Sequence, residues 1–356
     1  MSTFRVTRER IATITPHPNA DRLETAQVAS MTFQFCLGKS QFAVGDDVVY
    51  FPVDAILPPA LAAHLGVEKM LGGREHNRIK TVVLRGAVSQ GLVERTDKVA
   101  EFLGVAIDTL PDDLTAALGV TKYEVPEIPC KTGILVPHPE GVHTYDIEGC
   151  DRFPEVVAAL AAGPVFITEK LEGSNFYAAV LGDGAVVVGQ RNHQIKDIPG
   201  ARHDWWIAAE AGGILAALPA IKLSLGARSV VVRGEVCGPG VQGNLYGLKE
   251  RRVFVFDILV DDAYLDADRF LAVCADHGLT TVPVLARAAD LAVWLFGRTV
   301  RQAAHGISQL ASSVLREGIV IKPMREARHA ELATMGGRLL LKQRDPVYLA
   351  NEKDSA

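Results

Sequence analysis

The sequence predicts an α+β protein with two domains, a small β-barrel followed by a larger domain with mainly antiparallel sheets. Length is the first observation, because 356 residues exceed what one hydrophobic core usually organises. The second is that residues 1–115 consist of short candidate strands separated by turn residues, whereas strands and helices intermix after residue 153. With 48% apolar and 22% charged residues, the composition is that of an ordinary globular protein.

The first domain is expected over residues 1–120. Its candidate strands lie in RIATITPHP, LETAQVASMTFQF, FAVGDDVVYFPV and SQGLVER, which alternate or run apolar with Gly-Asp and Pro between them. Several short strands within about 100 residues favour a small barrel.

A turn in this domain, HPNADRL at residues 17–23, resembles the opening of OB-fold tRNA-binding domains. The resemblance implies contact with RNA. The same residues also suit a plain turn, in which proline fixes φ and Asn or Asp caps the bend, and both interpretations stay open.

The net charge of −5 is not that of a protein that coats nucleic acid. We therefore expect any nucleic acid to bind along a local basic patch, with an affinity that falls steeply with salt. The candidates in the first domain are Arg74, Arg78, Lys80 and Arg85.

Residues 121–153 are predicted to be a linker, because Pro126, Pro129, Pro137 and Pro139 interrupt a stretch with little periodicity. The second domain is expected over residues 154–350. Within it, FYAAVLGDGAVVVGQRN predicts a hairpin. DWWIAAEAGGILAAL and DADRFLAVCADHG predict helices, the second beginning at Asp266 and stopping at Gly278. SVVVRGEVCG, RVFVFDILV, GIVIKP and RLLLKQR predict strands.

Charged residues follow a hydrophobic run at Lys170-Leu171-Glu172-Gly173, and charges in such a place are costly unless they are paired or used. Further polar elements follow on or at the ends of predicted strands, in the order Arg191, Glu235, Phe256-Asp257, Glu317-Gly318 and Lys342. Six elements in this order resemble the covalent nucleotidyltransferases, the superfamily of ATP-dependent ligases and capping enzymes. That resemblance implies an OB-fold barrel followed by an ATP-grasp-like nucleotidyltransferase domain.

The chemistry of that superfamily explains the residue types. A lysine amine that attacks the α-phosphate of ATP must be neutral and in line with the pyrophosphate leaving group. By resemblance, Lys170 is the nucleophile that forms lysyl-AMP, and Lys322 and Lys342 hold phosphate. Glu317 holds a divalent metal, magnesium or manganese, or its waters.

The resemblance also assigns the nucleotide contacts. Glu235 accepts from a ribose hydroxyl, and Phe256 stacks on adenine, with Phe254 as the alternative. Arg191 meets the ribose or a 5′-phosphate end, while Glu169 and the backbone near Thr168 face the adenine edge. The full set that the resemblance places at the nucleotide is Thr168, Glu169, Lys170, Glu172, Asn175, Arg191, Glu235, Phe256, Lys322, Lys342 and Arg344, with Lys170, Glu317 and Lys342 as the catalytic residues.

Two positions depart from the usual pattern. Glu172 stands where DNA ligases commonly have aspartate, which leaves its role open. The last motif, usually lysine-x-lysine, is here Lys342-Gln343-Arg344. Arginine keeps the charge and can clamp phosphate with two hydrogen bonds, but it cannot shuttle a proton as an amine can.

The order of domains selects a branch of the superfamily. In DNA ligases and capping enzymes an OB domain follows the last lysine strand, whereas here twelve residues follow Arg344 and the barrel comes first. The layout, together with VGDDVVYFPVDAILP, resembles the nick-sealing RNA ligases of the Deinococcus type. The resemblance implies an ATP-dependent RNA ligase that acts on a nicked duplex with RNA at the 3′-OH side. The alternatives are a DNA-joining ligase, or an RNA- or tRNA-binding module with a degenerate second domain.

Five scattered cysteines without a C-x-x-C pair predict free thiols in a reducing compartment. The N-terminus has no apolar targeting region, and no apolar run approaches the length of a membrane span. The expected location is cytoplasmic, with no membrane contact and no obligate protein partner.

Overall fold

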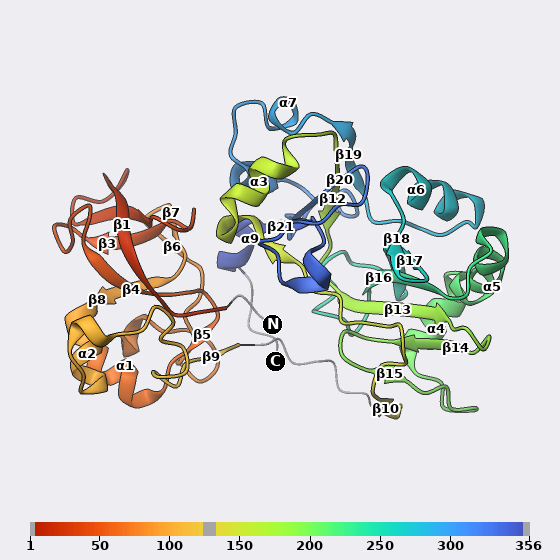
Figure 1. Ribbon diagram of the computed structural model, residues 1–356, viewed down its shortest axis with the longest axis horizontal. Coiled ribbons are helices and arrows are strands. Elements are labelled where there is room, and N and C mark those ends of the chain that lie inside the picture. Colours follow the sequence, from red (N-terminus) through yellow and green to blue (C-terminus); the bar gives the residue numbers. More distant parts are fainter. Residues whose placement is uncertain (1–3, 124–132, 352–356) are drawn as a thin grey trace. The chain divides into compact units, whose positions relative to one another are not determined.

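The computed structural model of the protein describes residues 4–123 and 133–351, and its contacts divide them into two units (Figure 1). The first unit comprises residues 4–123, 151–154 and 346–351; the second comprises residues 133–150 and 155–345. Pro126 and Pro129 of the predicted linker lie outside the described residues. Its later part, residues 133–150, groups with the second unit.

The first unit contains the barrel that the sequence predicts. Its five-stranded sheet has the order β3-β2-β1-β4-β8. The strands are β1 (Thr7–Pro16), β2 (Leu23–Val28), β3 (Phe35–Gly38), β4 (Asp47–Phe51) and β8 (Leu92–Arg95). The sheet curls almost closed, since Gln90 N donates to Gln34 O at 2.8 Å and Cys36 N donates to Ser89 Oγ at 2.9 Å.

Two hydrophobic clusters fill this unit, one on each side of β4. Val49 and Phe51 belong to one cluster and Val48 and Tyr50 to the other, as the two-residue period of a strand requires. The remaining elements are α1 (Pro59–Leu65), α2 (Thr96–Leu103), α9 (Pro346–Asn351), β5 (Ala55–Ile56), β6 (Val82–Leu84), β7 (Ala87–Ser89) and β9 (Thr121–Lys122). Helices α1 and α2 cover the Val49 side and end at left-handed glycines.

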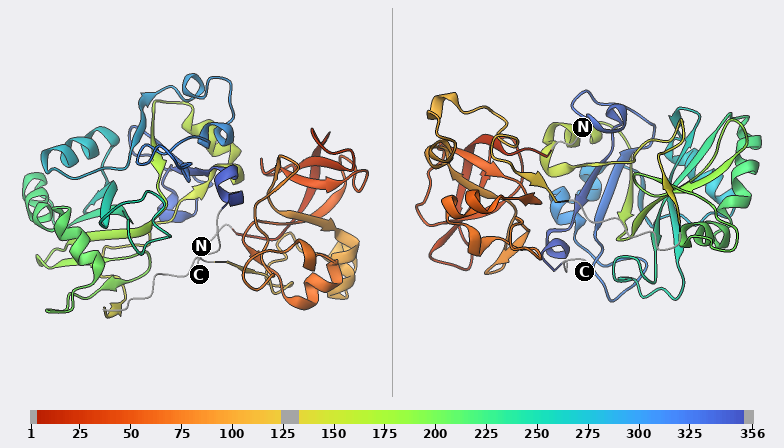
Figure 2. Two further views of the ribbon diagram at one scale, coloured as in Figure 1. Left: turned by 180° about the vertical axis from the view of Figure 1, so that it is seen from behind. Right: turned by 90° about the horizontal axis from the view of Figure 1, so that it is seen from below.

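The second unit is built on two mainly antiparallel sheets. The larger has the order β10-β15-β14-β13-β16-β17-β18 and the smaller the order β11-β21-β20-β12-β19. The strands of the larger sheet are β10 (Leu135–Val136), β13 (Ser174–Val180), β14 (Val186–Gly189), β15 (Gln194–Ile195), β16 (Val230–Cys237), β17 (Arg252–Val260) and β18 (Ala263–Tyr264). Those of the smaller sheet are β11 (Glu148–Gly149), β12 (Val165–Lys170), β19 (Val284–Ala289), β20 (Gly318–Pro323) and β21 (Leu341–Arg344). Figure 2 shows β20 and β21, in blue, beside β12 in both views.

Both faces of the larger sheet are covered, which is why β13 reads as a continuous apolar run. Phe176 and Ala178 face the main core with α4 (Asp204–Ala211), α5 (Ile214–Leu225) and α6 (Ala267–Asp276) (Figure 1). Tyr177 and Ala179 face a smaller cluster on the other side. The other helices of this unit are α3 (Pro154–Leu160), α7 (Leu291–Leu295) and α8 (Val300–Ala304).

The predicted hairpin is confirmed as β13–β14, but the helix expected from DWWIAAEAGGILAAL is two helices. The break falls at Gly212-Gly213, where Gly213 has a φ of 71°. Among the described residues no single helix has the length and apolar composition of a membrane span; α4 and α5 have them only together, bent by 62°.

Helix α6 begins after Asp266 as expected. The Asp266 carboxylate, however, accepts from the backbone N–H of Glu326 at 2.7 Å and not from the first turn of the helix.

Candidate active site

Strand register brings three of the predicted motifs to one point. Lys170, the last residue of β12, pairs with Gly318 at the start of β20, and Gly318 pairs in turn with Arg344 of β21. Glu317 precedes Gly318, so its carboxylate lies between the two cations. Lys170 Nζ donates to Glu317 Oε2 at 2.7 Å, and Arg344 Nε lies 3.0 Å from Glu317 Oε1.

A tight turn joins this point to the larger sheet. After Lys170 the chain passes through Leu171, Glu172 and Gly173 into β13, where Asn175 pairs with Glu235 of β16. A Cβ on Gly173 would lie 2.7 Å from Glu235 Cγ and 2.9 Å from Cys237 Sγ, closer than real Cβ contacts. The glycine therefore allows the turn to approach β16 and brings Lys170 toward Glu235.

The hydroxyl of Tyr246, which is not one of the predicted site residues, stabilises this turn. Its oxygen accepts from the backbone N–H of Glu172 at 2.7 Å, and its ring packs with Leu171 and Phe254. A lone tyrosine in a glycine-rich loop gave no signal in the sequence.

The two carboxylates have pKa values that are shifted in opposite directions. Burial raises the pKa of Glu235 from 4.5 to about 8, although the nearby charge of Lys170 opposes the shift. Burial also acts on Glu317, but the charges of Lys170, Arg344 and Lys342 outweigh it and lower the pKa of that carboxyl. Glu317 is thus held as a carboxylate, whereas Glu235 is mainly neutral at pH 7.

The other predicted residues of β12 and β21 lie close by. Thr168 and Glu169 are buried on β12, and Glu169 Oε2 accepts from the backbone N–H of Gln309 at 2.8 Å. Burial raises the pKa of Glu169, which the contact with Ser308 partly offsets. Lys342 is half-buried, and its charge contributes to the lowered pKa of Glu317.

The residues predicted for the sugar and base lie on or next to strands of the larger sheet. Arg191 follows β14 and pairs with Asp146, with Nη2 to Oδ2 at 2.9 Å. Of the two candidate stacking residues on β17, Phe254 is buried, whereas Phe256 is half-buried with its ring centre 4.9 Å from that of Tyr145. The partly exposed ring favours Phe256 as the stacking residue. Asp146 and Tyr145 were missed because their segment has the composition of a linker.

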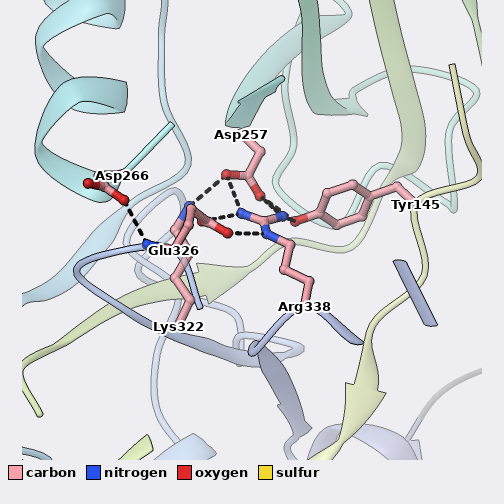
Figure 3. A network of polar contacts seen from close by, with 6 residues as sticks. All are labelled: Tyr145, Asp257, Asp266, Lys322, Glu326 and Arg338. Carbon is pink, nitrogen blue, oxygen red and sulfur yellow. Dashed lines mark hydrogen bonds and ion pairs between the residues drawn. The ribbon is translucent and has the colours of Figure 1, made fainter. Parts of the chain in front are cut away.

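Lys322 lies elsewhere on the smaller sheet, and its partners do not support the predicted phosphate contact. It pairs in register with Phe166, four residues along β12 from Lys170. Its ammonium is buried and donates to Asp257 Oδ1 at 2.6 Å, within the cluster of charged residues drawn in Figure 3. A buried ammonium paired in this way is costly to redirect.

The residues present fit a divalent metal bound together with a nucleotide. Among residues 4–123 and 133–351, no group of three or more His, Cys, Asp or Glu side chains could hold a metal ion. Magnesium-like ions usually bind through one or two carboxylates, keep several waters and contact substrate phosphates. Glu317, which is held as a carboxylate beside the nucleophile, provides one such ligand.

The first unit corrects the predicted basic patch. Arg78 is buried, with Nη2 2.5 Å from Asp54 Oδ1 and its guanidinium 3.7 Å from the centre of the Tyr123 ring. Arg74 and Arg85 are exposed, and Lys80 is half-buried. The predicted patch therefore consists of the exposed Arg74 and Arg85, with Lys80 partly accessible.

The HPNADRL turn has a structural role. His17 is buried; its Nε2 donates to Leu84 O at 3.0 Å and its Nδ1 accepts from Asn19 N at 3.1 Å. Asn19 Nδ2 donates to Arg85 O at 3.1 Å. These bonds fix the β6–β7 turn, in which Arg85 and Gly86 have φ values of 48° and 91°.

A lysine at a strand end, paired with a carboxylate and flanked by further cations, is the arrangement expected of a site for covalent nucleotidyl transfer. Family comparison agrees: residues 163–342 match the RNA ligase family, and residues 5–96 match an OB-fold domain. The chain belongs to the RNA ligase family, and the expected fold and ATP-dependent RNA ligase class are confirmed.

Solved structures of Naegleria gruberi RNA ligase resemble the whole chain. A mutant with ATP and Mn is 26% identical with a TM-score of 0.77, covering 98% of this chain and 99% of that chain. A mutant with AMP and Mn is 25% identical with a TM-score of 0.77 over the same shares. The enzyme with PPi is 25% identical with a TM-score of 0.76, covering 99% and 100%. No curated protein matches the chain.

Proposed function

We propose that this RNA ligase seals nicks between a 3′-hydroxyl and a 5′-phosphate in duplexes with RNA on the 3′-OH side. The reaction has three steps: adenylation of Lys170, transfer of AMP to the 5′-phosphate, and attack by the 3′-hydroxyl with release of AMP. The observation that carries the proposal is the pairing of Lys170 with Glu317 beside Arg344. The Naegleria structures with ATP and Mn and with PPi support the first step, since ATP is its substrate and pyrophosphate its leaving group, and the structure with AMP and Mn holds the group that is transferred.

Lys170 must lose a proton before its nitrogen can bond to the α-phosphorus as the bond to pyrophosphate breaks. The lowered pKa of Glu317 keeps that carboxyl ionised and paired with Lys170 Nζ. Nucleotide binding therefore has to separate the pair. A divalent cation would supply positive charge to the phosphates when bound, with Glu317 as the residue that would hold it or its waters.

The remaining roles follow the geometry. We assign phosphate contact to Lys342 and Arg344 in preference to Lys322, whose ammonium is already paired with Asp257. Glu235, mainly neutral at pH 7, can both donate to and accept from a ribose hydroxyl. Phe256 stacks on the adenine, and Arg191 faces the ribose or the 5′-phosphate.

The Deinococcus-type assignment is supported by the order of domains, with the OB-fold barrel before the ligase domain. We also propose a cytoplasmic location. Cys36, Cys150, Cys237 and Cys274 are free thiols, as a reducing compartment favours; Cys130 lies outside the described residues.

The test is covalent labelling with ATP that carries the label on its α-phosphate. Lys170→Ala should take up no label, because the amine that bonds to phosphorus is gone. It should still seal a nick whose 5′ end already carries AMP, since that step needs no lysine nucleophile. Lys249→Ala, which removes an exposed lysine from the same unit, should label like the wild type.

Normal labelling of Lys170→Ala would show that another residue is the nucleophile. Sealing should be compared between nicks with RNA and with DNA at the 3′-OH end. Equal rates on the two would favour the DNA-joining alternative.

A further inference from the structure

The segment at residues 133–150 contacts Arg191 and Phe256, two residues predicted to bind the nucleotide. None of the predicted site residues lies in this segment. His138 Nε2 donates to Arg191 O at 3.0 Å, and Asp146 pairs with the Arg191 side chain at 2.9 Å. The carbonyl of His143 accepts from Arg233 at 2.5 Å. Tyr145 lies against Phe256.

Both the ring and the hydroxyl of Tyr145 contact β17. Its ring lies 4.9 Å from that of Phe256, centre to centre, at 51°, within the range of favourable aromatic pairs. Its hydroxyl donates to Asp257, the residue after Phe256, and accepts from Arg338 Nη1 at 3.1 Å. Burial raises the pKa of Tyr145 well above its usual value, so the hydroxyl keeps its proton and remains a donor.

The partners of that hydroxyl are themselves fixed (Figure 3). Asp257 accepts from Arg338 at 2.7 and 3.0 Å and from Lys322 at 2.6 Å. Arg338 also donates to both oxygens of Glu326 at 2.6 Å. This cluster ties β17 to β20 and to the segment that precedes β21. Buried charges that are paired on all sides resist movement, so the hydroxyl of Tyr145 has one position.

We propose that Tyr145 is a positioning residue for nucleotide binding, which holds the ring of Phe256 in the orientation that stacks on the base. The inference rests on the proposed function, because it takes Phe256 as the stacking residue. Two attachments, ring to Phe256 and hydroxyl to Asp257, constrain neighbouring residues of one strand. The tyrosine thus fixes the Phe256 ring, which keeps part of its surface exposed.

The test measures lysyl-AMP formation in the full-length protein as a function of ATP concentration. Tyr145→Ala should raise KM for ATP about tenfold, the weight of a lost aromatic pair, while the yield of labelled protein at saturating ATP stays near that of the wild type. Tyr145→Phe keeps the ring and should raise KM about threefold. Tyr50→Phe, which removes a buried hydroxyl in the first unit, is the matched control and should leave KM unchanged.

A double-mutant cycle shows whether Tyr145 acts through Phe256. Phe256→Ala should raise KM by itself, and adding Tyr145→Ala should raise it little further, because the residue being positioned is absent. A purely structural tyrosine would instead lower the labelled yield without changing KM, and that result overturns the inference.

The two hypotheses fail in different ways. If Phe256→Ala raises KM and both Tyr145 variants do not, Tyr145 positions nothing, while the stacking assignment stands. If Phe256→Ala leaves KM unchanged, both the stacking assignment and the inference are wrong. Should Tyr145→Ala be insoluble, Tyr145→Phe decides by the same comparison. Labelling of Lys170 in the wild type tests the proposed function independently.

Discussion

Glu235 and Glu317 show how surroundings give two carboxyl groups of one site opposite charge states. Glu317 is buried and Glu235 is half-buried, and the loss of water contacts favours the neutral form of each. Glu317 has Lys170 and Arg344 within ion-pair distance and stays ionised, whereas the pKa of Glu235 rises to about 8. A pair of this kind can offer a fixed charge and a neutral hydrogen-bonding group at the same pH.

The raised pKa of Glu235 predicts a dependence of stability on pH. Between the unfolded pKa of 4.5 and the folded value of about 8, the folded protein binds the proton more tightly, so this residue's contribution to stability is lost as pH rises. Glu235→Gln keeps the shape without the charge. The free energy of unfolding of this variant, relative to that of the wild type, should therefore increase as the pH rises from 5 to 8.

Thermal unfolding of both proteins over this range, without nucleotide, measures the difference. A constant difference across the range would show that Glu235 is ionised in the folded protein.

At the scale of elements, the sequence predicted the strands and missed what the chain does between them. Hairpin β13–β14 and strands β16, β17 and β20 follow from apolar runs and turn residues, which are local signals. Lys322, Asp257 and Arg338 meet only through tertiary packing, and residues 133–150 look like a linker because their contacts are made by scattered side chains. The candidate site could be predicted from the order of the motifs along the chain. No local sequence pattern indicated a role for Tyr145 or Tyr246.

The turn from β12 to β13 joins Lys170 to the larger sheet, and Gly173 allows its close approach to β16. Gly173→Ala would place a Cβ against the backbone of Val236 and against Cys237, so β13 or β16 must shift. We expect a loss of about 2–4 kcal/mol in the free energy of unfolding and slower lysyl-AMP formation. The matched control is Gly163→Ala, where an added Cβ has no atom within 4 Å and stability should change by less than about 0.5 kcal/mol.

Chemical denaturation and single-turnover labelling of both variants provide the comparison. If Gly173→Ala has the stability and the labelling rate of the wild type, the turn can accommodate a Cβ, and the close approach to β16 does not require glycine.

For the whole molecule, an overall charge of −5 means that the proposed duplex substrate would have to be held by a local surface. Arg78 and Lys170 are engaged with Asp54 and Glu317, so they contribute little to such a surface. Exposed Arg85 lies at the tip of a hairpin turn fixed by His17 and Asn19. We therefore expect the turn that resembles an RNA-binding motif to act on nucleic acid, if at all, through Arg85, the residue that it supports.

Charge reversal at Arg74 and Arg85, the two exposed arginines of the predicted patch, tests this surface. Arg74→Glu with Arg85→Glu should weaken binding of a nicked duplex and reduce the slope of log affinity against log salt by roughly 1.5, the weight of two phosphate contacts. Sealing should slow at low duplex concentration, while lysyl-AMP formation, which needs no duplex, should keep its wild-type rate. Lys39→Glu with Arg95→Glu makes the same change in net charge at other exposed positions of this unit and should change the slope less. An equal loss in both double variants would mean that net charge alone governs capture of the duplex, and that the first unit has no localised grip.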